Sequence, residues 1–113
     1  MTVTITEQTY SSVKKIDFDW ATTGSTGGTT LKSYDGEVLR VVCNSATSTG
    51  GTITIKDEDG NDILMGAGTF TSGESYVGTT GRTPISAVAE STLAFVVSNA
   101  SSSGAGNCIV YIR

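Results

Sequence analysis

The chain has 113 residues, of which 37% are hydrophobic and 16% are charged, and its formal net charge is −4. A chain of this length predicts one domain with a single core. The acidic balance argues against a nucleic-acid partner, because such binding needs a basic face that neutralises phosphates. The sequence contains no histidine, which removes the usual proton shuttle and the commonest metal ligand near neutral pH.

The residue types favour extended structure. Threonine, valine and isoleucine recur along the chain, and their β-branched side chains fit a pleated surface better than a helix. The 14 glycines fall mostly in short runs that mark chain reversals. The N-terminal MTVTITEQTY has no basic region followed by an apolar run, so we expect no signal peptide, and no apolar stretch is long enough for a membrane helix.

Strand patterns with period two begin at the N-terminus. Val3 and Ile5 alternate with threonines, and Ile16, Phe18 and Trp20 alternate with charged residues. Further extended segments are expected at 37–44, 52–56, 62–65, 85–89, 91–100 and 107–113. About eight strands at this spacing predict a single-domain antiparallel β-sandwich over residues 1–113, either Ig-like or jelly-roll-like.

Turn signals separate these segments. TTGSTGGTT (22–30) is interpreted as a flexible connection, and YDGE (34–37) as an Asp-Gly turn or a bulge. The longest irregular segment is expected at TSGESYVGTTGRTP (71–84).

The acidic stretch DEDGND (57–62) raises the question of a calcium site. An EF-hand loop starting at Asp57 would need glycine where Asp62 stands and glutamate where Gly68 stands. A hairpin explains the same residues, with a turn centred on Asp59-Gly60-Asn61 and a return strand DILM at 62–65. The hairpin is the preferred interpretation, and calcium binding is the alternative.

Other candidate sites are weak. Asp17 and Asp19 share one strand face, as a glycosidase pair would, but they lie beside Lys15 on the face opposite the apolar one, where we expect solvent. The two Gly-Ala-Gly pieces, at 66–68 and 104–106, do not open a helix after a strand, so they predict no dinucleotide site. The sequence therefore predicts no catalytic residue, no cofactor and no metal.

The two cysteines, Cys43 and Cys108, lie in apolar strand-like segments. In a reducing compartment they are expected to be buried free thiols. A disulfide is the alternative, and it requires the two strands to be neighbours.

Aromatic residues could form a platform for sugars. Trp20 is in phase with Ile16 and Phe18 and is expected in the core, whereas Tyr76 in the long irregular segment is a better candidate for outward contact. A carbohydrate-binding or adhesive β-sandwich is therefore kept as an alternative function.

Five phrases spread over nearly the whole chain carry a family resemblance: SVKKIDFDWAT, SYDGEVLRVV, ITIKDEDGNDIL, TLAFVVSNA and IVYIR. In their order and texture they resemble the small capsid decoration, or cement, proteins of tailed bacteriophages. The resemblance implies a non-enzymatic protein on the outer capsid surface of the virion, made in the host cytoplasm. It implies the major capsid protein as a partner, together with self-association as a homotrimer or a dimer.

The resemblance assigns no residue by motif, so the contact elements are a hypothesis from the residues themselves. Residues 1–10 could serve as an interface arm that adds a strand to a neighbour. The long segment at 71–84 mixes apolar residues with arginine, as interface cores do. The expected interface residues are Val3, Ile5, Tyr10, Phe70, Tyr76, Val77 and Arg82.

Overall fold

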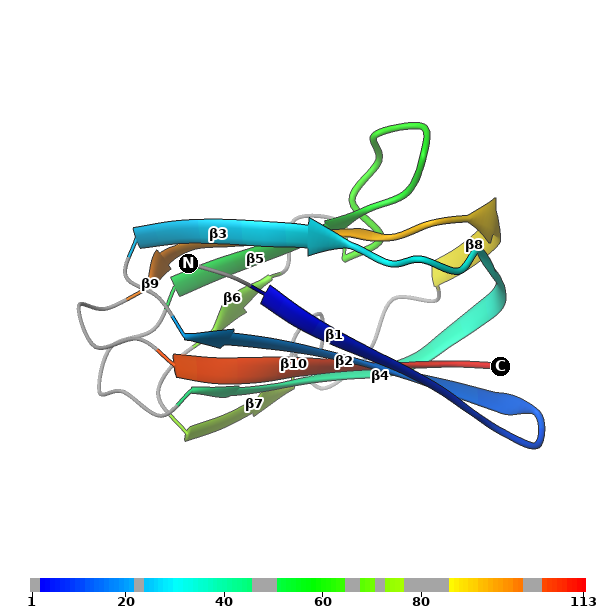
Figure 1. The fold of residues 1–113 in the computed structure, drawn as a ribbon, viewed down its shortest axis with the longest axis horizontal. Helices are drawn as coiled ribbons and strands as arrows, with labels where there is room; N and C mark the ends of the chain where they lie inside the picture. Colours follow the sequence, from blue (N-terminus) through cyan, green and yellow to red (C-terminus); the bar gives the residue numbers. More distant parts are fainter. Residues whose placement is uncertain are drawn as a thin grey trace.

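The computed structural model describes residues 3–21, 24–45, 51–64, 68–70, 73–76, 86–100 and 105–113. Within them, ten strands form two antiparallel sheets packed face to face (Figure 1). The first sheet has the order β1 (Val3–Tyr10), β2 (Val13–Ala21), β10 (Ala105–Ile112), β4 (Tyr34–Ser45) and β7 (Gly73–Tyr76), and β8 (Ser86–Ser91) also pairs with β4. The second has the order β3 (Gly24–Thr29), β9 (Ala94–Ala100), β5 (Gly51–Lys56) and β6 (Thr69–Phe70).

The strand order decides between the two predicted types of sandwich. Pairing is nested: β2 pairs with β10, β3 with β9, β4 with β7, and β5 with β6. Successive pairs alternate between the two sheets. A long hairpin that is rolled up in this way is a jelly roll. The strands β1 and β8 are additions to it, so the predicted all-β sandwich is confirmed in its jelly-roll form.

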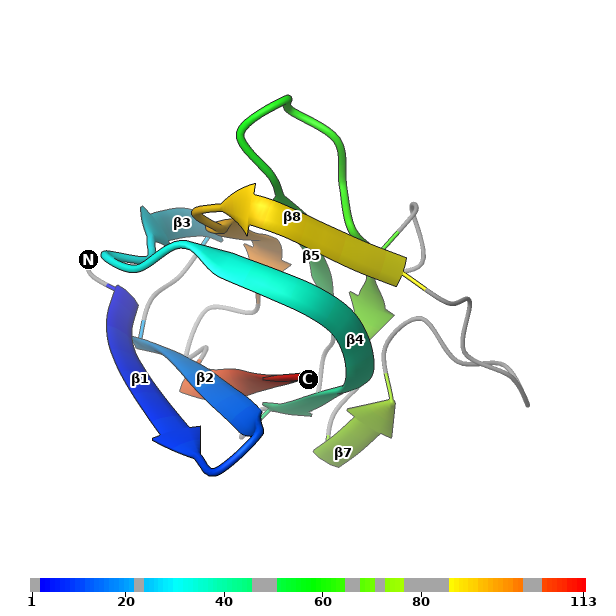
Figure 2. The same cartoon turned by 90° about the vertical axis from the view of Figure 1, so that its right-hand side faces the viewer.

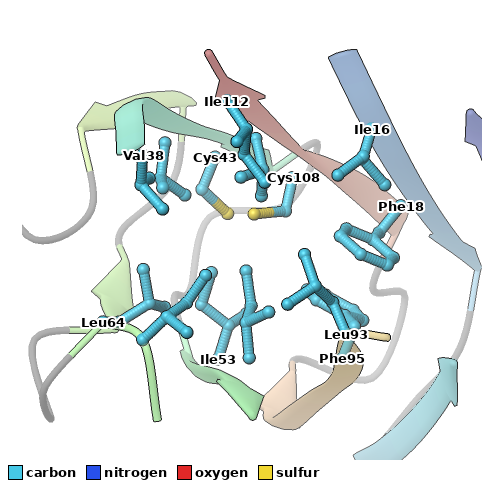
Figure 3. Close-up of a cluster of buried hydrophobic side chains, with 14 of the residues drawn as sticks. Ile16, Phe18, Val38, Cys43, Ile53, Leu64, Leu93, Phe95, Cys108 and Ile112 are labelled. Atoms are coloured by element: carbon cyan, nitrogen blue, oxygen red, sulfur yellow. The ribbon is translucent and has the colours of Figure 1, made fainter. Parts of the chain in front are cut away.

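The core lies between the sheets, where the alternating apolar residues predicted it. Phe18, Phe95, Ile53, Ile55 and Val110 are fully buried. The rings of Phe18 and Phe95 stack across the two sheets with centroids 4.7 Å apart. Trp20 is 3% exposed and stacks on Phe95, so its predicted place in the core is confirmed. Figure 3 shows side chains of both layers meeting in this cluster.

The strand β4 curves around one end of the molecule (Figure 2). The YDGE segment is a bulge, because the β4–β8 register shifts between Tyr34 and Gly36. Gly36 has a φ of 127°, and a Cβ there would lie 2.4 Å from the carbonyl oxygen of Arg113. Only glycine fits both requirements, so this residue fixes where β4 bends.

The segment 22–30, interpreted as a flexible connection, was a wrong prediction for most of its length. Residues Gly24–Thr29 form β3, which pairs with β9. A Cβ on Gly27 would lie 2.5 Å from the carbonyl oxygen of Phe95, so the missing side chain allows the close approach. The sequence of β3 shows no apolar alternation, because the backbone of Gly27, rather than a side chain, packs against β9.

Two other expectations need correction. Of the return strand expected at 62–65, residue 65 lies outside the described residues, and residues 62–64 form a single bridge between Lys56 and Asp62 followed by a turn at Ile63 and Leu64. Both of these apolar side chains are buried in the core, so burial replaces strand pairing there. The segment expected to be irregular at 71–84 contains the strand β7, which pairs with β4.

Candidate interaction surface

The strand β1 is an edge strand of the first sheet. It pairs with β2 along its whole length, from Val3 opposite Trp20 to Tyr10 opposite Val13. Val3 and Ile5 are partly buried against the core, and Cδ1 of Ile5 lies 3.3 Å from the position that a Cβ on Gly28 of β3 would take. The expected interface arm is therefore an integral strand, and its apolar side chains pack inward.

Among the described strands, only β2 pairs with β1, so the backbone of β1 has a free edge within this part of the chain. The register shows which residues form it. Arg113 and Glu37 exchange both backbone hydrogen bonds, each 2.9 Å long. Peptide groups alternate in direction along an antiparallel strand. The extra residue at the β10–β4 register shift, Leu39, lies on β4, so the alternation along β10 is kept and the peptide groups of Cys108 point toward β2. Cys108 is paired with Phe18 of β2, so the peptide groups of Phe18 point toward β10. The peptide groups of the next residue, Asp17, therefore point toward Thr6 of β1.

The same alternation continues along β1. Thr4, Thr6 and Gln8 bond to β2, whereas the peptide groups of the residues between them face away from the sheet. These outward residues are Val3, Ile5, Glu7 and Thr9.

This edge carries few of the features that usually protect a strand from pairing. The sequence VTITEQTY contains no lysine and no proline, and its register with β2 has no bulge. Exposed edges in natural proteins are normally blocked by such features. The one charged residue, Glu7, is turned toward the sandwich interior, on the same side as Val3 and Ile5. This inward-pointing charge is the protective feature that the strand has, and its outer side is otherwise regular and open to another strand among the described residues.

Glu7 fastens β1 to the connection between β3 and β4. Its carboxylate accepts hydrogen bonds from the backbone N–H groups of Leu31 and Lys32, at 3.0 and 3.1 Å, and from the hydroxyl of Tyr34 at 2.6 Å. Burial alone would raise the pKa of Glu7, but these hydrogen bonds and the Lys32 charge outweigh it and hold the pKa below its ordinary value. Burial and the adjacent carboxylate raise the pKa of Tyr34.

Leu31 is the most exposed large apolar side chain among the described residues, at 93%. Its N–H is held by Glu7, and the preceding Thr30 exchanges backbone and side-chain hydrogen bonds with Leu93, each 3.0 Å. A fully exposed leucine on a turn with this many hydrogen bonds is pre-organised to fill a partner's pocket. We call the free edge of β1 together with Leu31 the β1 edge surface.

The predicted interface residues do not all belong to this surface. Val3 and Ile5 contribute backbone groups, and Tyr10, which is 54% exposed, ends the strand with its hydroxyl donating to Gln8. The backbones of Phe70 and Tyr76 lie in β6 and β7. Val77 and Arg82 lie outside the described residues. Leu31 and Glu7 were missed, although a single leucine among turn residues in TTLKSYDG was a usable signal.

The outer face of β2 is less solvated than its alternating charges predicted. Oδ1 of Asp17 is buried and has no hydrogen-bond partner among the described residues. Burial and the neighbouring Asp19 carboxylate raise the pKa of Asp17, and Lys15 and Asn107 only partly offset them. The ionised form of Asp17 is therefore disfavoured at this position in the sheet.

The acidic DEDGND stretch is a turn, as preferred from the sequence. Oδ1 of Asp57 accepts hydrogen bonds from the N–H groups of Asp59 and Asn61, both 3.0 Å long. Oδ1 of Asp62 accepts from the N–H groups of Ile55 and Leu64. The carboxylates therefore organise the local backbone. Within the described part of the chain, no group of three or more acidic, cysteine or histidine residues could hold a metal.

A search for membrane helices and comparisons with known proteins bear on function. The described residues include no helix that is long and apolar enough to cross a bilayer. Protein-family models and curated proteins gave no match to this chain. The β1 edge surface therefore carries the functional argument on its geometry.

Proposed function

We propose that the protein is a structural component of a bacteriophage virion, which decorates the outer capsid surface and bridges neighbouring capsid subunits. The observation that carries the proposal is the regular eight-residue edge of β1, without lysine, proline or bulge, beside a hydrogen-bonded turn that exposes Leu31. The phrase-level resemblance to decoration proteins points the same way, and the jelly roll is a recurrent architecture of capsid proteins.

The proposed mechanism is strand addition. Val3, Ile5, Glu7 and Thr9 offer backbone donors and acceptors to an extended segment of a capsid subunit, and Leu31 enters an apolar pocket beside it. Backbone pairing supplies affinity with little demand on sequence, and the leucine supplies specificity. No catalytic step is part of this function.

Self-association would multiply a modest contact. In the proposal, a homotrimer or a dimer presents several β1 edge surfaces at once, so each capsid contact after the first becomes intramolecular. Bridging then follows from geometry, because one oligomer touches several capsid subunits. The major capsid protein is the partner in this arrangement.

Carbohydrate binding is the competing function. Tyr10 is the one aromatic side chain among the large exposed hydrophobic residues of the described structure, and a sugar platform needs such a ring. Parallel assays separate the two functions: cosedimentation with capsids that lack the protein, and glycan binding. The decoration proposal predicts saturable capsid binding and no glycan affinity. Glycan binding abolished by Tyr10→Ala, without capsid binding, would replace it with the carbohydrate proposal.

A further inference from the structure

Cys43 and Cys108 face each other across two adjacent strands in the middle of the first sheet. They are direct register partners of β4 and β10. Both are free thiols and both are fully buried. Figure 3 shows their sulfur atoms pointing toward one another at the edge of the apolar core. The condition for a disulfide that the sequence left open, neighbouring strands, is therefore met.

The hydrogen-bond alternation identifies the type of this pair. The peptide groups of Arg113 point toward β4. The β10–β4 register shifts between Tyr111 and Ile112, but the extra residue, Leu39, lies on β4, so counting back along β10 leaves the peptide groups of Cys108 pointing toward β2. Cys43 and Cys108 thus form a non-hydrogen-bonded pair. Directly opposed residues of this type have Cα atoms about 4.5 Å apart, which lies at the short end of the roughly 4.4–6.8 Å range of disulfides.

We propose that Cys43 and Cys108 form an oxidation site that closes an intramolecular disulfide between β4 and β10. The proposal does not rest on the decoration function. It adds to that function a covalent cross-link between the two strands at the middle of the sheet that carries β1. A chain that passes from a reducing compartment to an oxidising one would acquire the bond.

A low-molecular-weight disulfide such as oxidised glutathione is the oxidant. The thiolate of one cysteine attacks a glutathione sulfur, which releases one reduced glutathione and leaves a mixed disulfide. The second cysteine attacks the protein sulfur of that mixed disulfide and releases the second glutathione. The two protein thiols lose two protons and two electrons, and one glutathione disulfide becomes two thiols.

Burial determines when this exchange can occur. Both side chains have no exposed surface, and burial raises the pKa of the Cys43 thiol to about 12, so few thiolates are present in the native state. The bond therefore forms during folding or local opening. Once formed, it closes a loop of roughly 65 residues and restricts the unfolded chain.

The test compares disulfide formation in folded and unfolded protein at one redox poise. The full chain is equilibrated with a fixed ratio of reduced and oxidised glutathione, either in native buffer or in guanidinium chloride. Acid quenching, alkylation of the remaining thiols and mass measurement then give the fraction with the internal bond, which gains no alkyl group, whereas the dithiol gains two. Peptide mapping identifies the Cys43–Cys108 link.

If the native pair is pre-aligned, its ratio of disulfide to dithiol should be on the order of tenfold higher in native buffer than in guanidinium chloride. Cys43→Ala and Cys108→Ala are the matched controls, because neither variant can form an internal disulfide. An oxidised fraction that is equal or lower in native buffer would overturn the proposal, as would a predominance of mixed disulfides in the folded wild-type chain.

Discussion

The Glu7 carboxylate organises the β1 edge surface from the inner side of the strand. Three donors converge on it, and they fix both the edge strand and the exposed Leu31. A glutamine at this position keeps the shape but offers one acceptor oxygen and turns an NH₂ group toward donors. The position therefore links local stability to the geometry of the β1 edge surface.

Glu7→Gln should lower the free energy of unfolding by about 1 kcal/mol at pH 7, as expected for hydrogen bonds to a partly exposed charge. Because the folded-state pKa of Glu7 is lowered, its contribution is present above the ordinary value of 4.5 and is lost as the pH falls through the lowered value. Denaturant unfolding at pH 7 and pH 3 should show a smaller difference between variant and wild type at pH 3. The exposed Glu37→Gln serves as the control, and a pH-independent difference would contradict the ionic account.

Asp17 is the opposite case, because the fold disfavours its charge. Its raised folded-state pKa means that its contribution to stability is present below the ordinary value of 3.8 and is lost as the pH rises through the raised value. Asp17→Asn should therefore raise the free energy of unfolding by about 0.5 kcal/mol at pH 7, in the range for a partly solvated charge. The gain should vanish below pH 3.8. An unchanged or lower stability at pH 7, with Asp59→Asn in the exposed turn as the control, would show that solvent stabilises the charge of Asp17.

At the scale of elements, the edge strand allows a variant that separates pairing with a partner from folding. The N–H of Thr9 points away from β2, so proline there removes an outward donor and leaves the β1–β2 hydrogen bonds in place. Thr9→Pro should weaken capsid binding by about tenfold or more while the free energy of unfolding changes by less than about 1 kcal/mol.

Thr9→Ala is the matched control for this variant, because it removes the same side chain and keeps the N–H. Titration of assembled capsids with both variants gives the comparison. Equal affinities for Thr9→Pro and Thr9→Ala would show that the partner does not pair with the free edge of β1, and the mechanism of strand addition would then be wrong.

The elements also differ in how well sequence alone predicts them. The alternation of Ile16, Phe18 and Trp20, and of Cys108, Val110 and Ile112, identifies β2 and β10 because each has one buried and one outer face. The glycine-rich β3 carries no such pattern, since its pairing with β9 depends on the absence of side chains. Its strand character comes from its position in the jelly roll.

The candidate surface was only partly predictable for a related reason. The N-terminal segment was a sound expectation because its threonine alternation marks a strand. That its apolar side chains would pack inward depends on the facing Gly28, which lies far away in sequence. The hydrogen bond from the N–H of Leu31 to the Glu7 carboxylate likewise joins residues 24 positions apart. Local patterns carry no information about such contacts, so Leu31 becomes visible only in the folded chain.

At the scale of the whole molecule, the two sheets form a compact body about 36 × 31 × 26 Å in extent. The described core and the hydrogen-bonded turns give a rigid support on which the β1 edge surface is displayed. A rigid support lowers the entropy cost of binding. This is the property that a protein which holds neighbouring capsid subunits together would need.

The most direct measurement of the central claim is the stoichiometry of cosedimentation with assembled capsids that lack the protein. The account predicts saturable binding near one copy per capsid subunit. It also predicts that Leu31→Asp reduces binding far more than Ser33→Asp, which adds the same charge to the same exposed turn. Failure of the wild-type protein to saturate the capsids, or equal binding by the two variants, would contradict the account.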